Sequence, residues 1–474
     1  MNEVKVSVCY FDDIFDIQAP TCIPDYQRSY VWGKKKAEEL LTDFIELFVE
    51  NNSQENYYLG SILIYNNKDV KNEENKCEII DGQQRITTLL ILRYILDGSL
   101  PENQKIQFNT SQSVHYIKEV RDFFEEHRKE LEELHEKNFL QKLEFTKIIT
   151  YSEDDAFTFF DTQNNRGIKL SATDFLKAYH LREIRSEQLQ EKNALLWENI
   201  GYKNPQNSFL DYFFERMLWR GRNWRGKSIA YESKDTILEC FQKNTLKTDH
   251  ESSYPLYQSP NNIRYQKINW TGDDLPEFSS TTTYSNSPLY FPFSLRQPIH
   301  KGMNFFDYTK KYVSIYELLF ESEVAEADPV NAMRIYFTKV YDNDMSPYLK
   351  DLMKLLLIVF YDAFGKEKIC KAINYFDYSL GSLRLKNQQV KKESILKFLR
   401  EQSINLIDLI SMSYFPEDIF ENINNSGDLL NPYLNKEIES DNGVRGRYLQ
   451  RVLQHFQKDY IEISNRKLWL EQIL

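Results

Sequence analysis

Five consecutive residues, Asp81 to Arg85, combine side chains that could carry out phosphate chemistry. The carboxylate of Asp81 could hold a metal ion that bridges phosphates or position water, and the guanidinium of Arg85 could neutralise phosphate charge. Between them lie Gly82 and the amides of Gln83 and Gln84, either of which could orient an attacking water. These residues are therefore candidates for a phosphate or nucleotide site.

The residues around this motif predict a buried strand, a sharp turn and a helix. Two β-branched isoleucines precede Asp81, and the glycine of the Asp81-Gly82 pair can adopt a positive φ. From Gln83 to about Leu96, apolar residues recur at helical spacing. A helix that starts directly after a glycine turn points unpaired N–H groups and a positive dipole end outward, which suits phosphate. An ordinary strand–turn–helix with polar first-turn residues is the alternative.

Length and composition set the broad class. At 474 residues the chain is too long for one compact core, so we expect two or three domains. The formal net charge of −12 argues against a generally basic nucleic-acid-binding surface, although a local basic channel stays open. The five cysteines include no pair with metal-ligand spacing, which indicates a reducing compartment. No apolar run approaches membrane-spanning length, so we expect a cytoplasmic protein without a membrane segment.

The predicted fold class is α+β in three regions. Residues 1–100 alternate strand and helix patterns and predict a small α/β core. Residues 101–186 predict a helical extension of that domain. Residues 187–474 predict mostly helices, with a loop-rich Ser/Thr/Asn/Pro insertion near 248–301.

Within the extension, three features matter for the site. Charges at i, i+4 spacing predict one long helix over Val114–Leu134. The segment Leu143–Tyr151 is a strand candidate. Ser171 is expected to open a helix, with Asp174 three residues later as a variant of the capping box.

Three motifs appear in order and together carry a resemblance. They are Ile23-Pro-x-Tyr-Gln-Arg-x-Tyr-x-Trp32, Asp81-Gly-Gln-Gln-Arg-x-Thr-Thr-Leu89 and Asn165-Arg-Gly-x-x-Leu-Ser-x-x-Asp-x-x-Lys177. Over roughly residues 8–185 the chain resembles the GmrS side of the GmrSD type IV, modification-dependent restriction family. The first half of that family looks like the ParB/sulfiredoxin fold.

The resemblance implies a domain that binds and hydrolyses a nucleoside triphosphate with Mg²⁺, in bacterial defence against phage or other foreign DNA. Asp81 would be the metal ligand. Carried over residue by residue, the implied nucleotide-binding positions are Gln27, Arg28, Asp81, Gly82, Gln84, Arg85, Thr87, Asn165, Arg166 and Lys177. We expect Arg166 or Lys177 to close over the triphosphate from the helical side. Helix capping and a surface salt bridge are the alternative roles of the third motif.

Aromatic and basic residues are candidates for contact with DNA. In the first motif, Tyr26, Tyr30 and Trp32 could stack on a base or sense a modification, or they could be core aromatics. A second cluster, with Arg216 and Lys227 at its ends and Trp219 and Trp224 inside, contains the three arginines that we predict to contact DNA. These are Arg220, Arg222 and Arg225. A solvated helix end and loop is the alternative.

The sequence shows neither a nuclease motif nor a convincing P-loop. None of the seven histidines stands in the His-x-x-Pro-like motif of a His-Asn-His nuclease module, so we expect that module to be missing and cleavage to need a partner. The segment Gly221–Ser228 formally fits a Walker A motif. A real P-loop follows a buried strand, but here an amphipathic helix is predicted before the glycine.

The leading prediction is a nucleotide-dependent sensor or regulatory subunit of a modification-dependent restriction system. It would act with a nucleoside triphosphate of unknown base, with plain or modified DNA, and with a nuclease partner. A non-hydrolysing adaptor that recruits a separate nuclease is the second hypothesis, and a self-sufficient ParB-like nuclease is the third. The sequence leaves the oligomeric state open, a homo-oligomer included.

Overall fold

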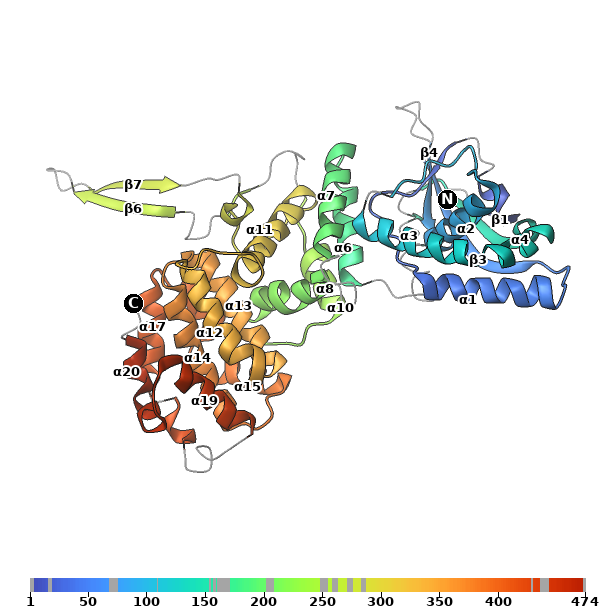
Figure 1. Cartoon of the computed structure of the whole chain (residues 1–474). Helices are drawn as coiled ribbons and strands as arrows, with labels where there is room; N and C mark the ends of the chain where they lie inside the picture. Colours follow the sequence, from blue (N-terminus) through green and yellow to red (C-terminus); the bar gives the residue numbers. More distant parts are fainter. Residues whose placement is uncertain are drawn as a thin grey trace. The chain divides into compact units, whose positions relative to one another are not determined.

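The computed structural model describes residues 4–15, 19–67, 76–108, 110–152, 155–156, 159, 171–201, 209–247, 255–257, 263–270, 276–282, 287–427, 429–434 and 443–471. The chain divides into two compact units, residues 1–210 and residues 211–474. Each unit has its own buried hydrophobic side chains, and Figure 1 shows the helices and strands of both.

A mixed five-stranded sheet forms the centre of the N-terminal unit, with strand order β1-β5-β3-β4-β2. β3 runs parallel to β5 and antiparallel to β4, which places its middle beside the candidate turn at the end of β4. The short edge strand β2 pairs in parallel with β4. The strands are β1 (Lys5–Tyr10), β2 (Thr21–Cys22), β3 (Tyr57–Asn67), β4 (Lys76–Asp81) and β5 (Leu143–Thr150).

Helices that share one buried core pack on one face of this sheet (Figure 1), and Leu63 and Ile80, which point to the other face, are buried as well. The core includes Phe44, Leu89 and Phe124 from three of the helices and Ile64 and Phe145 from the strands. Alternation along β3, β4 and β5 places these strand residues on the covered face. The helices of the unit are α1 (Lys34–Phe44), α2 (Gln83–Asp97), α3 (Ser111–Glu126), α4 (Arg128–Glu136), α6 (Ala172–Arg182) and α7 (Glu187–Gly201).

The single long helix predicted over Val114–Leu134 is wrong. The structure has two helices, α3 and α4, separated at His127, whose φ of −105° and ψ of 29° are not helical. The bend lets Phe124 and Leu131 both reach the same core. Charge spacing could not predict this, because it reports the solvated face and not the direction of the axis.

The C-terminal unit is a helical bundle (Figure 1). Helices α13 and α14 are buried over most of their length. Helix α13 packs against α11, α14 and α16. The helices are α9 (Arg220–Asn223), α10 (Lys234–Leu238), α11 (Met303–Phe320), α12 (Pro329–Asp344), α13 (Pro347–Phe364), α14 (Ile369–Lys386), α15 (Lys392–Glu401), α16 (Leu406–Met412), α17 (Pro416–Asn425), α19 (Val444–Phe456) and α20 (Arg466–Glu471). The short helix α8 (Phe209–Phe213) spans the boundary between the units.

The predicted fold class is confirmed, because an α/β sheet domain is followed by a mostly helical remainder. The stretch predicted as a loop-rich insertion contains an antiparallel pair, β6 (Ile263–Trp270) and β7 (Pro276–Thr282). No helix in the described part of the chain is long and apolar enough to cross a membrane.

Candidate functional site

The turn between β4 and α2 has the backbone that the sequence predicts. Gly82 has a φ of 94° and lies directly before α2, and no side chain caps that helix. A Cβ at Gly82 would lie 2.6 Å from Cγ2 of Ile62, so both conformation and space require glycine. No side chain therefore caps the first N–H groups of α2, and uncapped N–H groups at a helix N-terminus are suited to binding an anion.

The first two motifs are joined by the glutamine amides. Gln84 accepts hydrogen bonds from the backbone N–H groups of Val31 (2.9 Å) and Trp32 (3.2 Å) and donates one to the carbonyl of Ser29 (3.1 Å). Gln83 donates to the carbonyl of Arg28 at 2.9 Å. Both glutamine side chains are buried. These amides therefore fix the 28–32 loop over the start of α2.

A third amide joins the loop to the strand that precedes the turn. Gln27 donates from Nε2 to the carbonyl of Ile80 at 2.9 Å, and its side chain is buried. Gln27 and Arg28, which the resemblance assigns to the nucleotide site, line one pocket together with Gln83. Whether they bind nucleotide stays a prediction.

Arg85 and Asp81 interact with each other and with β3. The guanidinium of Arg85 donates to the carbonyls of Leu59 and, at 2.7 Å, of Ser61, around an irregularity in the β3–β5 pairing. Its Nη2 lies 3.6 Å from Oδ2 of Asp81. Burial lowers the pKa of Arg85, while the Asp81 carboxylate opposes that shift. Arg85 thus positions β3 in this structure, and a phosphate contact would add to that role.

Lys177 from the third motif is buried beside the first motif. Its Nζ donates to the carbonyl of Gln27 at 2.7 Å and forms an ion pair with Glu198 at 2.7 Å. Glu198 also accepts a hydrogen bond from the hydroxyl of Ser29 at 2.6 Å. The predicted cap of α6 is confirmed, since Ser171 and Asp174 form a capping box that starts the helix carrying Lys177.

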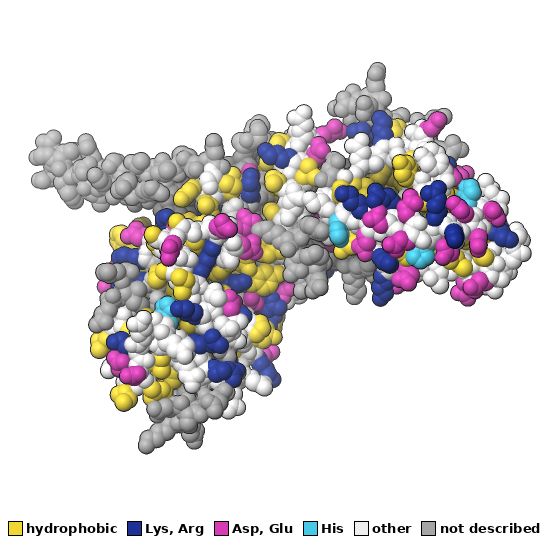
Figure 2. Space-filling model, in the orientation of Figure 1, with side chains coloured by type: hydrophobic (Ala, Val, Ile, Leu, Met, Phe, Trp, Pro, Cys, Tyr) yellow, Lys and Arg dark blue, Asp and Glu magenta, His cyan; other side chains and the backbone are white. Residues whose placement is uncertain are grey.

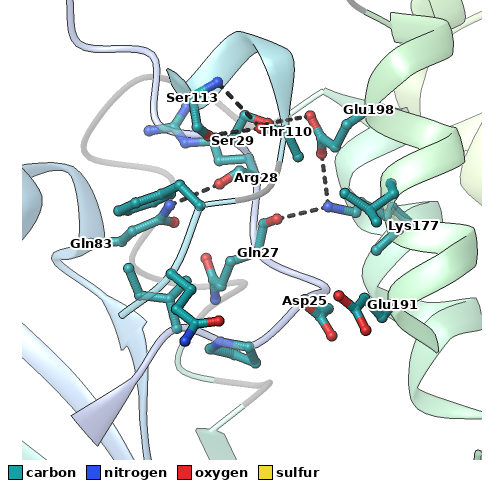
Figure 3. A pocket seen from close by; sticks show the side chains of 16 residues that line it. Asp25, Gln27, Arg28, Ser29, Gln83, Thr110, Ser113, Lys177, Glu191 and Glu198 are labelled. Atoms are coloured by element: carbon teal, nitrogen blue, oxygen red, sulfur yellow. Dashed lines mark hydrogen bonds and ion pairs between the residues drawn. The ribbon is translucent and has the colours of Figure 1, made fainter. Parts of the chain in front are cut away.

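A pocket lies where the first-motif loop, the start of α2 and helices α6 and α7 meet (Figure 3). Arg28, Gln83 and Lys177 line it from three different motifs. Asp25 and Glu191 face each other at its edge. Desolvation and the Glu191 charge raise the pKa of Asp25.

Sequence reasoning missed Asp25, Glu191 and Glu198. A signal for the last two existed, because Glu191, Ala194 and Glu198 recur at helical spacing and share one face of α7. Asp25 lies within the first motif, but at a position that the motif leaves open. Among the described residues, no group of three or more His, Cys, Asp or Glu side chains could hold a metal ion.

The remaining residues of the predicted site lie in different places. Asn165 and Arg166 lie outside the described residues. Thr87 is buried in α2, and its hydroxyl has no partner among the residues that the structure describes. Tyr30 is fully buried and shares a 2.8 Å hydrogen bond with Thr88, so it is a core aromatic with no exposed face for DNA.

The other two aromatic residues of the first motif are partly buried. Trp32 packs against the core of the unit. The hydroxyl of Tyr26 lies 3.4 Å from Oε2 of Glu78. On the face that Figure 2 shows, basic side chains of the N-terminal unit are interspersed with acidic ones.

The basic and aromatic patch expected around Arg220 requires correction. Arg220 is 1% exposed and binds Glu232 at 2.7 Å, while Arg222 donates to the carbonyls of Leu295 and Gln297. Trp219 and Trp224 are likewise buried, because the residues form helical turns that pack in the core. Of the three arginines predicted to contact DNA, only Arg225 is exposed.

The Walker A match is not a P-loop in structure. Its Gly221 lies inside α9, which continues from the π-helical turn Phe214–Trp219 and not from a strand. A Cβ at Gly221 would lie 2.7 Å from Leu295, so the glycine serves close packing. This agrees with the prediction from sequence.

Glu232 should give the C-terminal unit a measurable acid sensitivity. Burial raises its pKa, but Arg220 and Lys392 overcome that effect and bring the pKa to about 2, from a usual 4.5. A depressed pKa stabilises the fold above about pH 4.5, and this contribution is lost as pH falls towards 2; its size is roughly 3 kcal/mol. Urea unfolding between pH 6 and pH 3 should show a steeper loss of stability for wild type than for Glu232→Gln. Equal slopes would contradict the ion-pair assignment.

Two protein-family models match the chain in separate stretches. The sheet domain with the glycine turn at Gly82 falls within residues 11–181, which match the GmrSD restriction endonuclease N-terminal domain. Residues 189–439, more than half of the 474 residues, match the family of unknown function DUF7834. The chain therefore belongs to the DUF7834 family and carries an N-terminal domain of the GmrSD type. No curated protein matches the chain.

The N-terminal domain supports a role in a type IV restriction system, and thereby in antiviral defence. The region that matches DUF7834 shows no His-Asn-His nuclease module. These two matches fix the family and the general context of the protein.

Proposed function

We propose that this protein is the nucleotide-binding regulatory subunit of a type IV-like restriction system, and that DNA cleavage is carried out by a separate nuclease polypeptide. The pocket at the start of α2 encloses about 60 Å³, so it would take a phosphate group of a nucleoside triphosphate whose remainder lies outside it. Its occupancy would report to the helical C-terminal region. Modified DNA would be the signal that the complex responds to. The GmrSD-type domain supports the restriction context.

One observation carries the nucleotide site. The uncapped glycine turn at Gly82 lies beside a pocket to which all three motifs contribute a polar residue. Lys177 is already neutralised by Glu198. Among the described lining residues, Arg28 is the cation that has no ion pair, so it is the side chain available for a phosphate.

Asp81 is the residue that would hold magnesium. Mg²⁺ bound with a nucleotide needs only one or two protein carboxylates, because phosphates and water complete its coordination. The Asp81 carboxylate is partly exposed at the end of β4, and its only close cation among the described residues is Arg85 at 3.6 Å. A single carboxylate suits this role, but Asp81 does not line the pocket that Arg28 and Gln83 line, so the nucleotide would have to extend past the Gly82 turn to reach it. Bound magnesium would supply charge neutralisation at the phosphates.

The protein's own residues would act mainly by positioning. Gln83 and Gln84 hold the loop that carries Arg28, and Lys177 holds the same loop from the helical side through the carbonyl of Gln27. A phosphate that draws Arg28 inward would therefore pull on a loop already joined to α6 and α7. Such a link would transmit nucleotide occupancy towards the end of the N-terminal unit.

Replacing Arg28 with alanine should weaken nucleotide binding without unfolding the domain. A hydrogen bond to a charged group contributes about 1.5–3 kcal/mol, so affinity should fall roughly ten- to hundredfold. Only the side chain is lost, while the Arg28 carbonyl that Gln83 binds is retained. Calorimetric titration with each of the four Mg-nucleoside triphosphates measures the effect.

Arg121→Ala is the matched control for this experiment. Arg121 lies in α3, is half exposed and pairs only with its neighbour Asp122 among the described residues. It should bind nucleotide as wild type does. If Arg28→Ala also binds each nucleotide as tightly as wild type, the proposed site is wrong.

The structure gives specific support to the non-hydrolysing alternative. The side chains of Gln83 and Gln84 are buried and bonded to the 28–32 backbone, whereas orienting an attacking water would need a free amide. Binding without turnover is therefore a second candidate function. Phosphate release by the purified protein, measured with and without plain and modified DNA, separates the two: turnover above background supports hydrolysis, and binding without release supports the adaptor.

A further inference from the structure

A second polar pocket lies wholly within the C-terminal unit, in residues that the family comparison leaves without a function. It forms where α12 ends, α13 begins, α14 ends and α19 begins. Its volume is about 400 Å³, within the range of small-molecule sites. The residues used below are Ser346, Arg384, Gln388, Lys391 and Arg447.

The side chain of Arg384 is the most unusual group in this pocket. The residue is 3% exposed, so its guanidinium is almost fully removed from bulk water. Nη2 donates to the carbonyls of Asn387 and, at 2.5 Å, of Gln388. Its Nε has no hydrogen-bond partner among the described residues. A buried cation that lacks a full set of acceptors is costly, so a water molecule or a ligand is needed to complete the hydrogen bonds of this guanidinium.

The electrostatic surroundings of Arg384 are positive. Burial lowers its pKa, and the charge of Arg445 lowers it further. Within the described part of the chain, no salt bridge to a carboxylate is seen for Arg384. A buried guanidinium that has no carboxylate partner among the described residues favours an anion at this position.

The rest of the pocket has the same character. Three of its described lining residues are basic, Arg384, Lys391 and Arg447, and none is acidic, although acidic residues outnumber basic ones by 71 to 59 in the whole chain. Val444 and Arg447 come from the first turn of α19, whose dipole places partial positive charge there. Ser346 and Gln388 add neutral polar side chains.

We propose that this pocket binds a phosphate group. The buried Arg384 guanidinium would anchor the phosphate, and the exposed ammonium group of Lys391 would add a second positive charge beside it. Arginine suits this role because its planar donors match phosphate oxygens. The phosphate could belong to a small molecule or to a nucleic-acid backbone, which present the same chemistry to these side chains. The site is separate from the nucleotide pocket of the N-terminal unit and does not depend on it.

Titrations at constant ionic strength test this inference. Full-length protein is titrated with inorganic phosphate, pyrophosphate and a short DNA duplex, and affinity and melting temperature are recorded. The variants are Lys391→Gln, which removes an exposed charge, and Arg384→Lys, which keeps the charge but loses the fork of donors. Lys397→Gln is the control, because Lys397 is exposed on α15 and does not line this pocket. Arg28→Ala serves to remove the proposed nucleotide site.

For one of the phosphate probes, we expect binding that raises the melting temperature, persists in Arg28→Ala and weakens at least fivefold in Lys391→Gln. Response to inorganic phosphate or pyrophosphate identifies a small-molecule site, and response to duplex alone identifies a backbone-phosphate site. Arg384→Lys should lose the remaining affinity if it folds, as judged by circular dichroism, and Lys391→Gln decides the question if it does not. No binding to any probe, or equal binding by Lys391→Gln and Lys397→Gln, would overturn the proposal. Loss of binding in Arg28→Ala alone would also overturn it, because the phosphate would then occupy the other site.

Discussion

Replacing Arg466 with leucine should destabilise the C-terminal unit by about 3–5 kcal/mol, the usual cost of removing one member of a buried ion pair. Arg466 is 1% exposed and Asp377 is fully buried, and the guanidinium binds the carboxylate directly. Without Arg466, the negative charge of Asp377 would remain in the core without its cation. Urea unfolding followed by circular dichroism measures the change.

The effect should be large because the pair is the centre of a network. Asp377 accepts hydrogen bonds from the hydroxyls of Tyr336 (2.5 Å), Tyr341 (2.7 Å) and Tyr448 (3.1 Å). These residues lie on α12, α14, α19 and α20, so one carboxylate orients four helices. A Cβ at Gly381 would lie 2.0 Å from the hydroxyl oxygen of Tyr448, which shows how closely α14 and α19 approach there.

Two further variants test this interpretation. The double variant Arg466→Leu with Asp377→Leu should recover part of the lost stability, because it removes the uncompensated charge. Lys397→Leu, at an exposed position on α15, should change stability by less than about 0.5 kcal/mol. A cost below about 1 kcal/mol for Arg466→Leu would show that the network does not stabilise the bundle.

No feature of the sequence pointed to this network. Tyr336 and Arg466 are 130 residues apart, and each is unremarkable in its own helix. Only the packing of α12 and α20 against the same helix, α14, brings them together. The same holds for Arg220, which looked like part of a surface patch because its partner Glu232 lies outside its helix and is also bound by Lys392 from α15.

Local features, by contrast, could be predicted from the sequence. The positive φ of Gly82, the start of α2 at Gln83 and the Ser171–Asp174 cap all depend on residues within one turn of each other. The α+β class followed from the period of the apolar residues. What the sequence could not predict was the partner of each polar side chain, since those partners lie in loops about 55 residues away.

This difference matters most for Gln84. By sequence it is a candidate to orient a catalytic water, whereas in the structure its amide holds the first-motif loop through Val31, Trp32 and Ser29. Replacing Gln84 with leucine would leave two backbone N–H groups and one carbonyl without their partner. We expect a loss of roughly 2–5 kcal/mol in the stability of the N-terminal unit, because each unpaired buried group costs about 1–3 kcal/mol and water can reach some of them.

Stability and nucleotide binding, measured on the same samples, distinguish the two roles of Gln84. A positioning role predicts that Gln84→Leu lowers the melting temperature and weakens nucleotide binding together, because Arg28 lies in the loop that is released. A purely catalytic role predicts unchanged stability and unchanged binding with loss of phosphate release alone. Gln141→Leu, at an exposed position after α4, controls for the loss of an amide and should behave as wild type. Because the structure bonds every polar atom of the Gln84 amide group to the backbone, we expect the first outcome, in which the motif's second glutamine builds the pocket and does not react within it.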